Sequence, residues 1–406
     1  MLQVKEKTKC CGCTACYSVC PKQCISMKPD EEGFLYPVVD EESCVQCGLC
    51  EKVCPFYSKS AEPKKETVFA AVQHTDFEKR KTSTAGGAFT LIADEILRRK
   101  GTVYAVGYDE NMVVCHKKCL EKEEQQKLRG SKYVQSDLKD TFREIKDLLK
   151  QEQQVLFVGT PCQVHGLKNV IGDHKNLYTI DLLCLGVSSP KLFAKWLEYL
   201  KEKYSSSVVD VQFRNKHYGY ATPNVRVFFE NGREMDQKYD SKVHANLFFR
   251  HYNVRPSCYE CEFREVPRKS DFTIGDFTEI GTFCKSMDDD WGTTKLWIHT
   301  PKGKELLDAV KQQMQLLVVE ELSTNIVGGP KKQIQIPEKR TEFFKDAEEL
   351  PYKELIAKWE PKKFKGELVG VLRQVLNHVP GKKLLFQYLR KQKLKKHAKK
   401  VSEINR

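Results

Sequence analysis

Short apolar runs alternate with longer amphipathic segments through the middle of the chain, and this pattern predicts an α/β domain. Strands are expected at 68–72, 102–106, 155–158, 177–183, 225–229, 271–275 and 295–299. Helices are expected at 88–99, where Gly101 closes the helix, and at 138–150, 191–203 and 303–313. The Asn231-Gly232 pair is typical of a hairpin turn, so some antiparallel strands should accompany the parallel ones.

Composition divides the chain into three predicted domains. Residues 1–57 are dense in cysteine, residues 66–345 carry the alternating pattern, and residues 351–406 are basic. The polar stretch at 58–65 indicates a linker.

Positive charge is concentrated in the C-terminal segment. Residues 351–406 hold 16 Lys or Arg against 4 Asp or Glu, a balance of +12, which leaves about +1 of the total +13 for the first 350 residues. Apolar positions at helical spacing predict amphipathic helices on both sides of Pro380-Gly381. Two interpretations stay open: a helix packed on the body with a solvated end, or attraction to anionic lipid at the inner face of the membrane. Nucleic acid is not expected as a partner, because no nucleic-acid-binding motif accompanies the charge.

The 406-residue chain has no run of about 18 apolar residues, so no transmembrane helix is expected. Its first residues lack the apolar core of a signal peptide, which predicts a cytoplasmic protein. Thiols stay reduced in that compartment, so the 17 cysteines indicate metal binding rather than disulfides.

Two cysteine motifs of the same spacing lie in the first 57 residues. They are Cys10-x2-Cys13-x2-Cys16-x3-Cys20-Pro21 and Cys44-x2-Cys47-x2-Cys50-x3-Cys54-Pro55. This spacing is typical of bacterial two-cluster ferredoxins, in which the fourth cysteine of each motif binds the other cluster. An α+β ferredoxin-like domain is therefore expected, with two 4Fe–4S clusters: one on Cys10, Cys13, Cys16 and Cys54, the other on Cys44, Cys47, Cys50 and Cys20. Four-cysteine zinc sites are the alternative, but zinc ribbons use paired C-x2-C units. Cys11 and Cys24 fall outside the pattern and are expected not to be ligands.

Four cysteines of the body form a further candidate set. Cys162 follows the strand at 155–158, Cys184 follows the strand at 177–183, and Cys258 and Cys261 form a C-x2-C pair. Ligand sites collect at strand ends along one edge of an α/β sheet. From the residues alone, a third cluster and ordinary buried cysteines both remain open.

Five ordered motifs in the body resemble the coenzyme F420 hydrogenase/dehydrogenase beta-subunit family over about residues 66–320. They are Ser83-Thr-Ala-Gly86-Gly87-Ala-Phe89, Arg129-Gly130-Ser131-Lys132-Tyr133, Gly159-Thr-Pro-Cys162-Gln163, Arg255-Pro-Ser-Cys258-Tyr-Glu-Cys261 and Ser270-Asp271-Phe-Thr-Ile-Gly275-Asp276-Phe277. Members of that family bind FAD and a 4Fe–4S cluster. The resemblance implies that Cys162, Cys184, Cys258 and Cys261 hold a third 4Fe–4S cluster and that the α/β domain binds FAD.

The local sequence around the implied flavin site is open to two interpretations. Glycines before a helix let backbone N–H groups approach a phosphate, but Gly86-Gly87 is also compatible with an ordinary helix start. No G-x-G-x-x-G fingerprint is present. The resemblance favours the flavin and implies contacts from Thr84, Gly86, Gly87, Ser131, Lys132, Tyr133 and Ser136.

These observations predict a flavin- and iron–sulfur-dependent oxidoreductase that moves electrons between the clusters and FAD and on to an organic substrate or a deazaflavin-like acceptor. The ferredoxin domain and the tail are departures from the archaeal hydrogenase subunit and argue against coenzyme F420. Bacterial members of this build imply a setting in polysaccharide biosynthesis. The alternatives are an electron-transfer subunit that serves a separate catalytic partner, or a scaffold that has lost its flavin. His217 and Asp276 are conceivable proton donors, although a loop histidine is more often inert.

Overall fold

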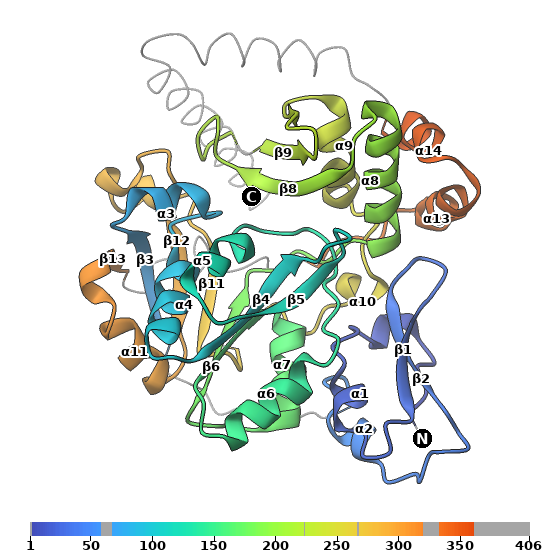
Figure 1. Ribbon diagram of the computed structural model, residues 1–406, viewed down its shortest axis with the longest axis horizontal. Helices are drawn as coiled ribbons and strands as arrows, with labels where there is room; N and C mark the ends of the chain where they lie inside the picture. Colours follow the sequence, from blue (N-terminus) through green and yellow to red (C-terminus); the bar gives the residue numbers. More distant parts are fainter. Residues whose placement is uncertain (1, 58–66, 223, 266–267, 320–332, 361–406) are drawn as a thin grey trace, which may run out of the picture.

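The computed structural model describes residues 2–360 except 58–66, 223, 266–267 and 320–332 (Figure 1). The predicted linker and the predicted helices of the tail therefore lie outside the described residues. The strands are β1 (Ile25–Pro29), β2 (Leu35–Val39), β3 (Val68–His74), β4 (Thr102–Tyr108), β5 (Val114–Cys119), β6 (Val155–Gly159), β7 (Leu177–Leu182), β8 (Val208–Asn215), β9 (Asn224–Phe229), β10 (Glu234–Met235), β11 (Phe272–Asp276), β12 (Thr294–Ile298) and β13 (Met314–Val318). The α-helices are α1 (Ala15–Val19), α2 (Leu49–Lys52), α3 (Phe77–Thr82), α4 (Ala88–Arg98), α5 (Lys122–Gln125), α6 (Thr141–Lys150), α7 (Pro161–Ile171), α8 (Pro190–Tyr204), α9 (Tyr239–Phe249), α10 (Pro256–Tyr259), α11 (Pro301–Asp308), α13 (Arg340–Glu349) and α14 (Tyr352–Trp359).

The N-terminal domain pairs a β-hairpin with two short helices that carry cysteines. β1 and β2 are antiparallel, and α1 and α2 each follow a residue in the left-handed conformation, Thr14 and Gly48. Such a residue turns the chain sharply, so each cysteine loop doubles back before its helix. The domain lies at the lower right of Figure 1, and α1 packs against α6 and α7 of the body.

The body is built on an eight-stranded mixed sheet in the order β13-β3-β12-β11-β7-β6-β4-β5. β4, β6, β7 and β11 are parallel, and β5, β12 and β13 pair antiparallel with their neighbours. One apolar core joins α4 and α11 to one face of this sheet, and another joins α6 and α7 to the other face. The expected α/β domain with antiparallel additions is thus confirmed. β5, β13 and α7 were not predicted.

The helix α4 ends one residue earlier than its sequence suggested. Lys100, not Gly101, takes the left-handed conformation, with φ of 60°. The N–H of Lys100 donates to the carbonyl of Leu97, and the N–H of Gly101 donates to that of Ile96. These two bonds form a Schellman motif, in which Gly101 occupies the position after the left-handed residue.

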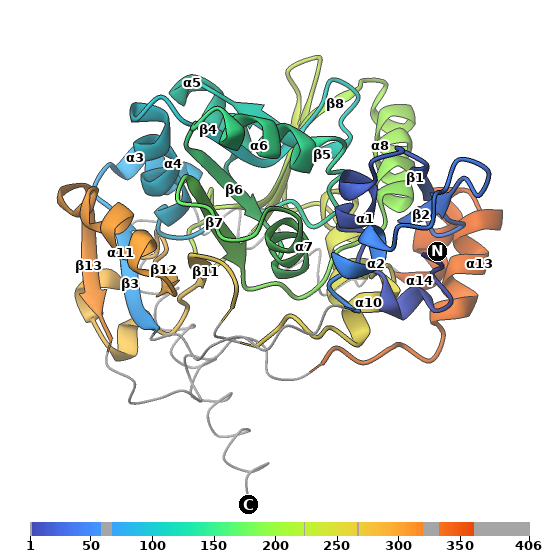
Figure 2. The ribbon, with the colours of Figure 1, turned by 90° about the horizontal axis from the view of Figure 1, so that it is seen from below.

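A second, smaller sheet and four helices pack together around a core of their own. β8, β9 and β10 form an antiparallel sheet, as the Asn231-Gly232 turn predicted for its last two strands. Their core is shared with α8, α9, α13 and α14. Figure 2 shows α8 and α13 beside the β1–β2 hairpin, where Arg340 of α13 pairs with Glu32. Trp359 of α14 is buried in the shared core, so the packed part of the chain extends into the segment assigned to the basic tail.

His244 of α9 makes this second core sensitive to acid. Burial lowers the pKa of His244 from 6.5 to about 3, and its ring stacks on Trp196. Since the unfolded chain binds the proton more readily below pH 6.5, stability should be fully present above that pH and decline as pH falls toward 3. We expect His244→Gln to flatten this decline by up to about 1.4 kcal/mol per pH unit.

The measurement is the free energy of unfolding in urea between about pH 7.5 and pH 5. Exchange of the exposed His217 for Gln is the control and should leave the slope unchanged. An identical slope in His244→Gln and the unsubstituted chain would contradict the assignment.

No helix within the described ranges is both long enough and apolar enough to cross a membrane.

Candidate iron–sulfur and flavin site

The structure gathers the twelve predicted cysteine ligands into three groups of four. Each group lines a separate pocket, and the grouping follows the crossed pattern expected for a two-cluster ferredoxin. We name the three places the distal, proximal and third sites.

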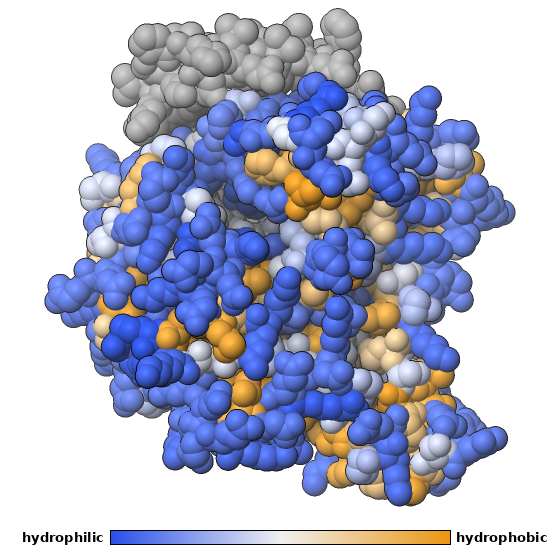
Figure 3. Space-filling view, viewed as in Figure 1, coloured by the Kyte–Doolittle hydropathy of each residue, from blue (hydrophilic) through white to orange (hydrophobic). Residues whose placement is uncertain are grey.

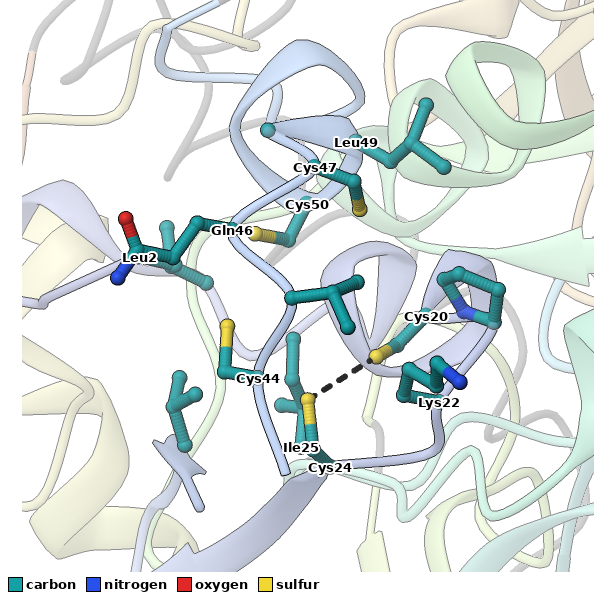
Figure 4. A pocket seen from close by; sticks show the side chains of 14 residues that line it. Leu2, Cys20, Lys22, Cys24, Ile25, Cys44, Gln46, Cys47, Leu49 and Cys50 are labelled. Atoms are coloured by element: carbon teal, nitrogen blue, oxygen red, sulfur yellow. Dashed lines mark hydrogen bonds between the residues drawn. The ribbon is translucent and has the colours of Figure 1, made fainter. Parts of the chain in front are cut away.

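The distal site is lined only by residues of the N-terminal domain. Its cysteines are Cys20, Cys44, Cys47 and Cys50. In Figure 4 the three cysteines of the second motif face Cys20 of the first motif, and Cys24 stands beside Cys20 with its sulfur 3.4 Å away. Cys47 is exposed, so this site is open to solvent. Figure 3 shows hydrophobic side chains over this domain, where Val45 and Leu49 are exposed.

The proximal site lies where the N-terminal domain meets the body. Its cysteines are Cys10, Cys13, Cys16 and Cys54. Gly166 of α7 packs against this loop, because a Cβ there would come within 2.7 Å of the Cys13 sulfur. The body therefore forms part of the environment of this site.

The third site lies in the body at the carboxyl ends of β6 and β7. Its cysteines are Cys162, Cys184, Cys258 and Cys261. Thr160 caps α7, Pro161 takes its first position, and Cys162 follows. Two strand ends and the loop around α10 thus deliver four thiols to one place.

Cys11 lines both the proximal and the third pocket. Its side chain is buried, with 8% exposed. Phe56 also lines both pockets, so the proximal and third sites adjoin. Nothing in the pattern of the sequence indicates that these two sites adjoin.

The donor chemistry of the third site fits an iron–sulfur cluster. Burial raises the pKa of the Cys184 thiol to about 12, and negative charge on Cys162 and Cys261 adds to this effect. Buried thiols of this kind become thiolates when iron supplies positive charge. Among the described residues, no group of three His, Cys, Asp or Glu side chains converges on one metal position. A cubane needs no such convergence, because it distributes its four cysteines over four irons.

Two of the implied flavin contacts meet across the carboxyl edge of the main sheet. The Ser131 N–H donates to Thr84 Oγ1 at 2.9 Å, and the two hydroxyls are 3.2 Å apart. Gly130, just before Ser131, has φ of 82° and open space where a Cβ would stand. Its backbone is thus accessible to a ligand, as a phosphate site requires.

Gly86 and Gly87 serve packing at the same edge. A Cβ on Gly86 would come within 2.0 Å of the Val72 carbonyl oxygen and 2.6 Å of the Thr294 nitrogen. Gly87 has φ of 92° and precedes α4. The close approach at Gly86 is therefore to the strands of the sheet.

The remaining three implied contacts are held by other partners. The Lys132 ammonium donates to the Arg129 carbonyl at 2.9 Å, and burial lowers its pKa to about 8. The Tyr133 ring stacks on Phe248. Ser136 pairs with His116 and Gln163, close to the third site.

Arg214 links Tyr133 to the end of β11. Its guanidinium lies 2.8 Å from the Asp276 carboxylate and 3.5 Å from the Tyr133 hydroxyl. The Arg214–Asp276 pair is partly exposed. His217 is exposed on the following loop and donates its backbone N–H to Asn215.

Lys216 is a site residue that was not predicted from the sequence. Its buried ammonium donates to the carbonyls of Arg80, Ala85 and Trp291 at 2.7 to 2.8 Å. Burial lowers its pKa to about 7. It ties the Ser83–Gly87 segment to the loop before β12, so Thr84, Ser131, Tyr133 and Asp276 surround one edge of the sheet. A lysine in a polar stretch gives no sequence signal of such burial.

Two family models match the two regions of the chain that carry the cysteine ligands. Residues 9–57 match the 4Fe-4S dicluster domain, and residues 152–323 match the C-terminal region of the coenzyme F420 hydrogenase/dehydrogenase beta subunit. The body is thus similar to the coenzyme F420 hydrogenase/dehydrogenase beta-subunit family over residues 152–323, and the N-terminal domain is similar to 4Fe-4S dicluster domains. The first match contains all eight cysteines of the distal and proximal sites, and the second contains the four of the third site. The family resemblance stated from the motifs is thereby confirmed.

Among solved structures, the chain is similar to a chain of the F420-reducing [NiFe] hydrogenase complex from Methanosarcina barkeri, studied by xenon derivatization. The identity is 16%, the match covers 74% of this chain and 95% of the other, and the TM-score is 0.44. A comparison with curated proteins finds no significant match. The two matches together support an iron–sulfur electron-transfer protein.

Proposed function

We propose that the chain is a flavin-dependent oxidoreductase in which electrons pass between the distal, proximal and third clusters and an FAD at the carboxyl edge of the main sheet. The distal site exchanges electrons with a redox partner, because Cys47 is exposed there. The third site lies at the strand ends beside the Ser136–Gln163 pair. A flavin suits the end of the electron path inside the body, because it couples one-electron transfer to two-electron chemistry on an organic substrate.

The observation that carries this proposal is the position of Cys11. It lines the proximal and third pockets together, so the two sites adjoin inside the protein. Electron transfer falls steeply with distance, and a shared wall supports direct transfer between them. The N-terminal domain is then an electron conduit, and the body is the place of chemistry.

The flavin part of the proposal is supported by the residues at the sheet edge. The Thr84 and Ser131 hydroxyls and the open backbone of Gly130 offer polar groups to a phosphate. The Arg214–Asp276 pair offers charged groups at the end of β11. Bound FAD would supply hydride or electron-pair transfer. The bacterial resemblance suggests an organic substrate in polysaccharide biosynthesis, and the +12 balance of residues 351–406 supports association of the tail with anionic lipid at the inner face of the membrane.

The test is anaerobic purification followed by quantitation of iron and flavin. We expect about twelve irons per chain from three clusters, with one FAD. About eight irons would remove the third cluster from the proposal. Twelve irons without flavin would contradict the flavin part and favour the alternative, an electron-transfer subunit that docks its exposed distal site on a catalytic partner.

A further inference from the structure

Arg255 is a fully buried cation that connects the body to the cysteine loop of the proximal site. It precedes α10, and its side chain is 0% exposed. Its Nε donates to the Cys10 carbonyl at 2.9 Å, and one Nη donates to the Leu35 carbonyl at 3.0 Å. The other Nη donates to Gln135 Oε1 at 2.8 Å. Each of the three guanidinium nitrogens thus donates a hydrogen bond.

The sequence of the cysteine loop leaves space for this side chain. Gly12 has φ of 66°, and a Cβ there would come within 3.0 Å of an Arg255 nitrogen and 2.7 Å of the Gln135 amide nitrogen. The guanidinium also lies over the Tyr36 ring, 4.3 Å from its centroid. Gly12, Gln135 and Tyr36 therefore hold Arg255 in one position.

The described partners of Arg255 include no carboxylate. A buried, unneutralised charge is costly, so negative charge must lie close to it. The Cys10 sulfur lies 3.7 Å from a guanidinium nitrogen. Arg255 also lines the third site, three residues before Cys258. Its charge therefore stands between two sets of thiolates.

We propose that Arg255 tunes the proximal cluster by placing a buried positive charge and a hydrogen-bond donor against its Cys10 thiolate. Reduction adds an electron to an already negative cluster, and a nearby cation stabilises the reduced state more than the oxidised one. Arg255 thus raises the reduction potential of the proximal cluster. This role rests on the proposed function, since it requires a cluster at the proximal site.

The test is a redox titration of the full holoprotein, with the clusters followed by electron paramagnetic resonance. In Arg255→Gln, we expect the ratio of reduced to oxidised proximal cluster at a fixed potential to fall about tenfold, a shift of about 59 mV for a one-electron couple. Arg255→Lys keeps the charge and should restore most of the ratio. The control is Arg340→Gln, which removes an arginine that pairs with Glu32 at the same domain contact and donates to the Val254 carbonyl.

Gln135→Glu tests the same charge without removing Arg255. A carboxylate at this position would neutralise the guanidinium and should also lower the ratio. An unchanged ratio in Gln135→Glu, or an equal fall in Arg340→Gln, would overturn the proposal. Iron content distinguishes a failure of the role of Arg255 from a failure of the proposed function. About twelve irons with an unmoved potential reject only the role of Arg255, whereas loss of proximal iron from the unsubstituted chain rejects the proposed function.

Discussion

Replacing Cys258 by serine should remove the third cluster and leave the two N-terminal clusters in place. Iron favours soft thiolate ligands in such clusters, and a serine hydroxyl is a poor substitute. Cys258 is one of four thiols that line the third pocket, and it comes from a different segment than Cys162 and Cys184. Iron should therefore fall from about twelve to about eight atoms per chain. Flavin reduction through the clusters should be lost with it.

The measurement is iron analysis beside the redox signals of the N-terminal clusters. Cys284→Ser is the matched control, since Cys284 contacts Ser286 and belongs to none of the three sets. Cys11→Ser should also retain about twelve irons, because Cys11 forms the wall between the pockets rather than a ligand. A Cys258→Ser chain with undiminished iron would show that these four cysteines do not hold a cluster.

The cysteine sets of the distal and proximal sites could be predicted because their spacing is local. Each C-x2-C-x2-C run brings three thiols to one loop, and the following Cys-Pro supplies the crossed ligand. The pockets group these residues as that rule requires. The parallel strands could be predicted equally well, since residues 155–158 and 177–183 are continuous apolar runs, as expected for strands covered by helices on both faces.

The connections between the sites could not be predicted, because they depend on tertiary contacts between distant residues. Arg255 and Gln135 reach Cys10 and Cys11 across more than a hundred residues of sequence. Lys216 is buried because three carbonyls from separate loops converge on it. The missed strand β8 has polar residues between its buried positions, as expected for a sheet with one face toward a core.

The proximal cluster holds the central position in the proposed path of the electrons. Leu2 lines both the distal and the proximal pocket, and Cys11 lines both the proximal and the third pocket. Cys13 of the proximal site is buried against Gly166 of α7. Replacing Cys13 by serine should therefore interrupt electron transfer between the distal cluster and the flavin. The distal cluster should still be reduced, and the flavin should no longer receive its electrons. Cys24→Ser is the matched control, because Cys24 borders the distal pocket outside the ligand pattern.

The most direct test is rapid anaerobic mixing of the flavin-loaded holoprotein with a reduced protein donor, which is too large to reach the interior. The rate of flavin reduction is measured in the unsubstituted chain, in Cys24→Ser and in Cys13→Ser. We expect fast flavin reduction in the first two proteins and only the background rate in Cys13→Ser, while the distal cluster of Cys13→Ser is still reduced. Equal flavin reduction in all three proteins would contradict transfer through the proximal cluster.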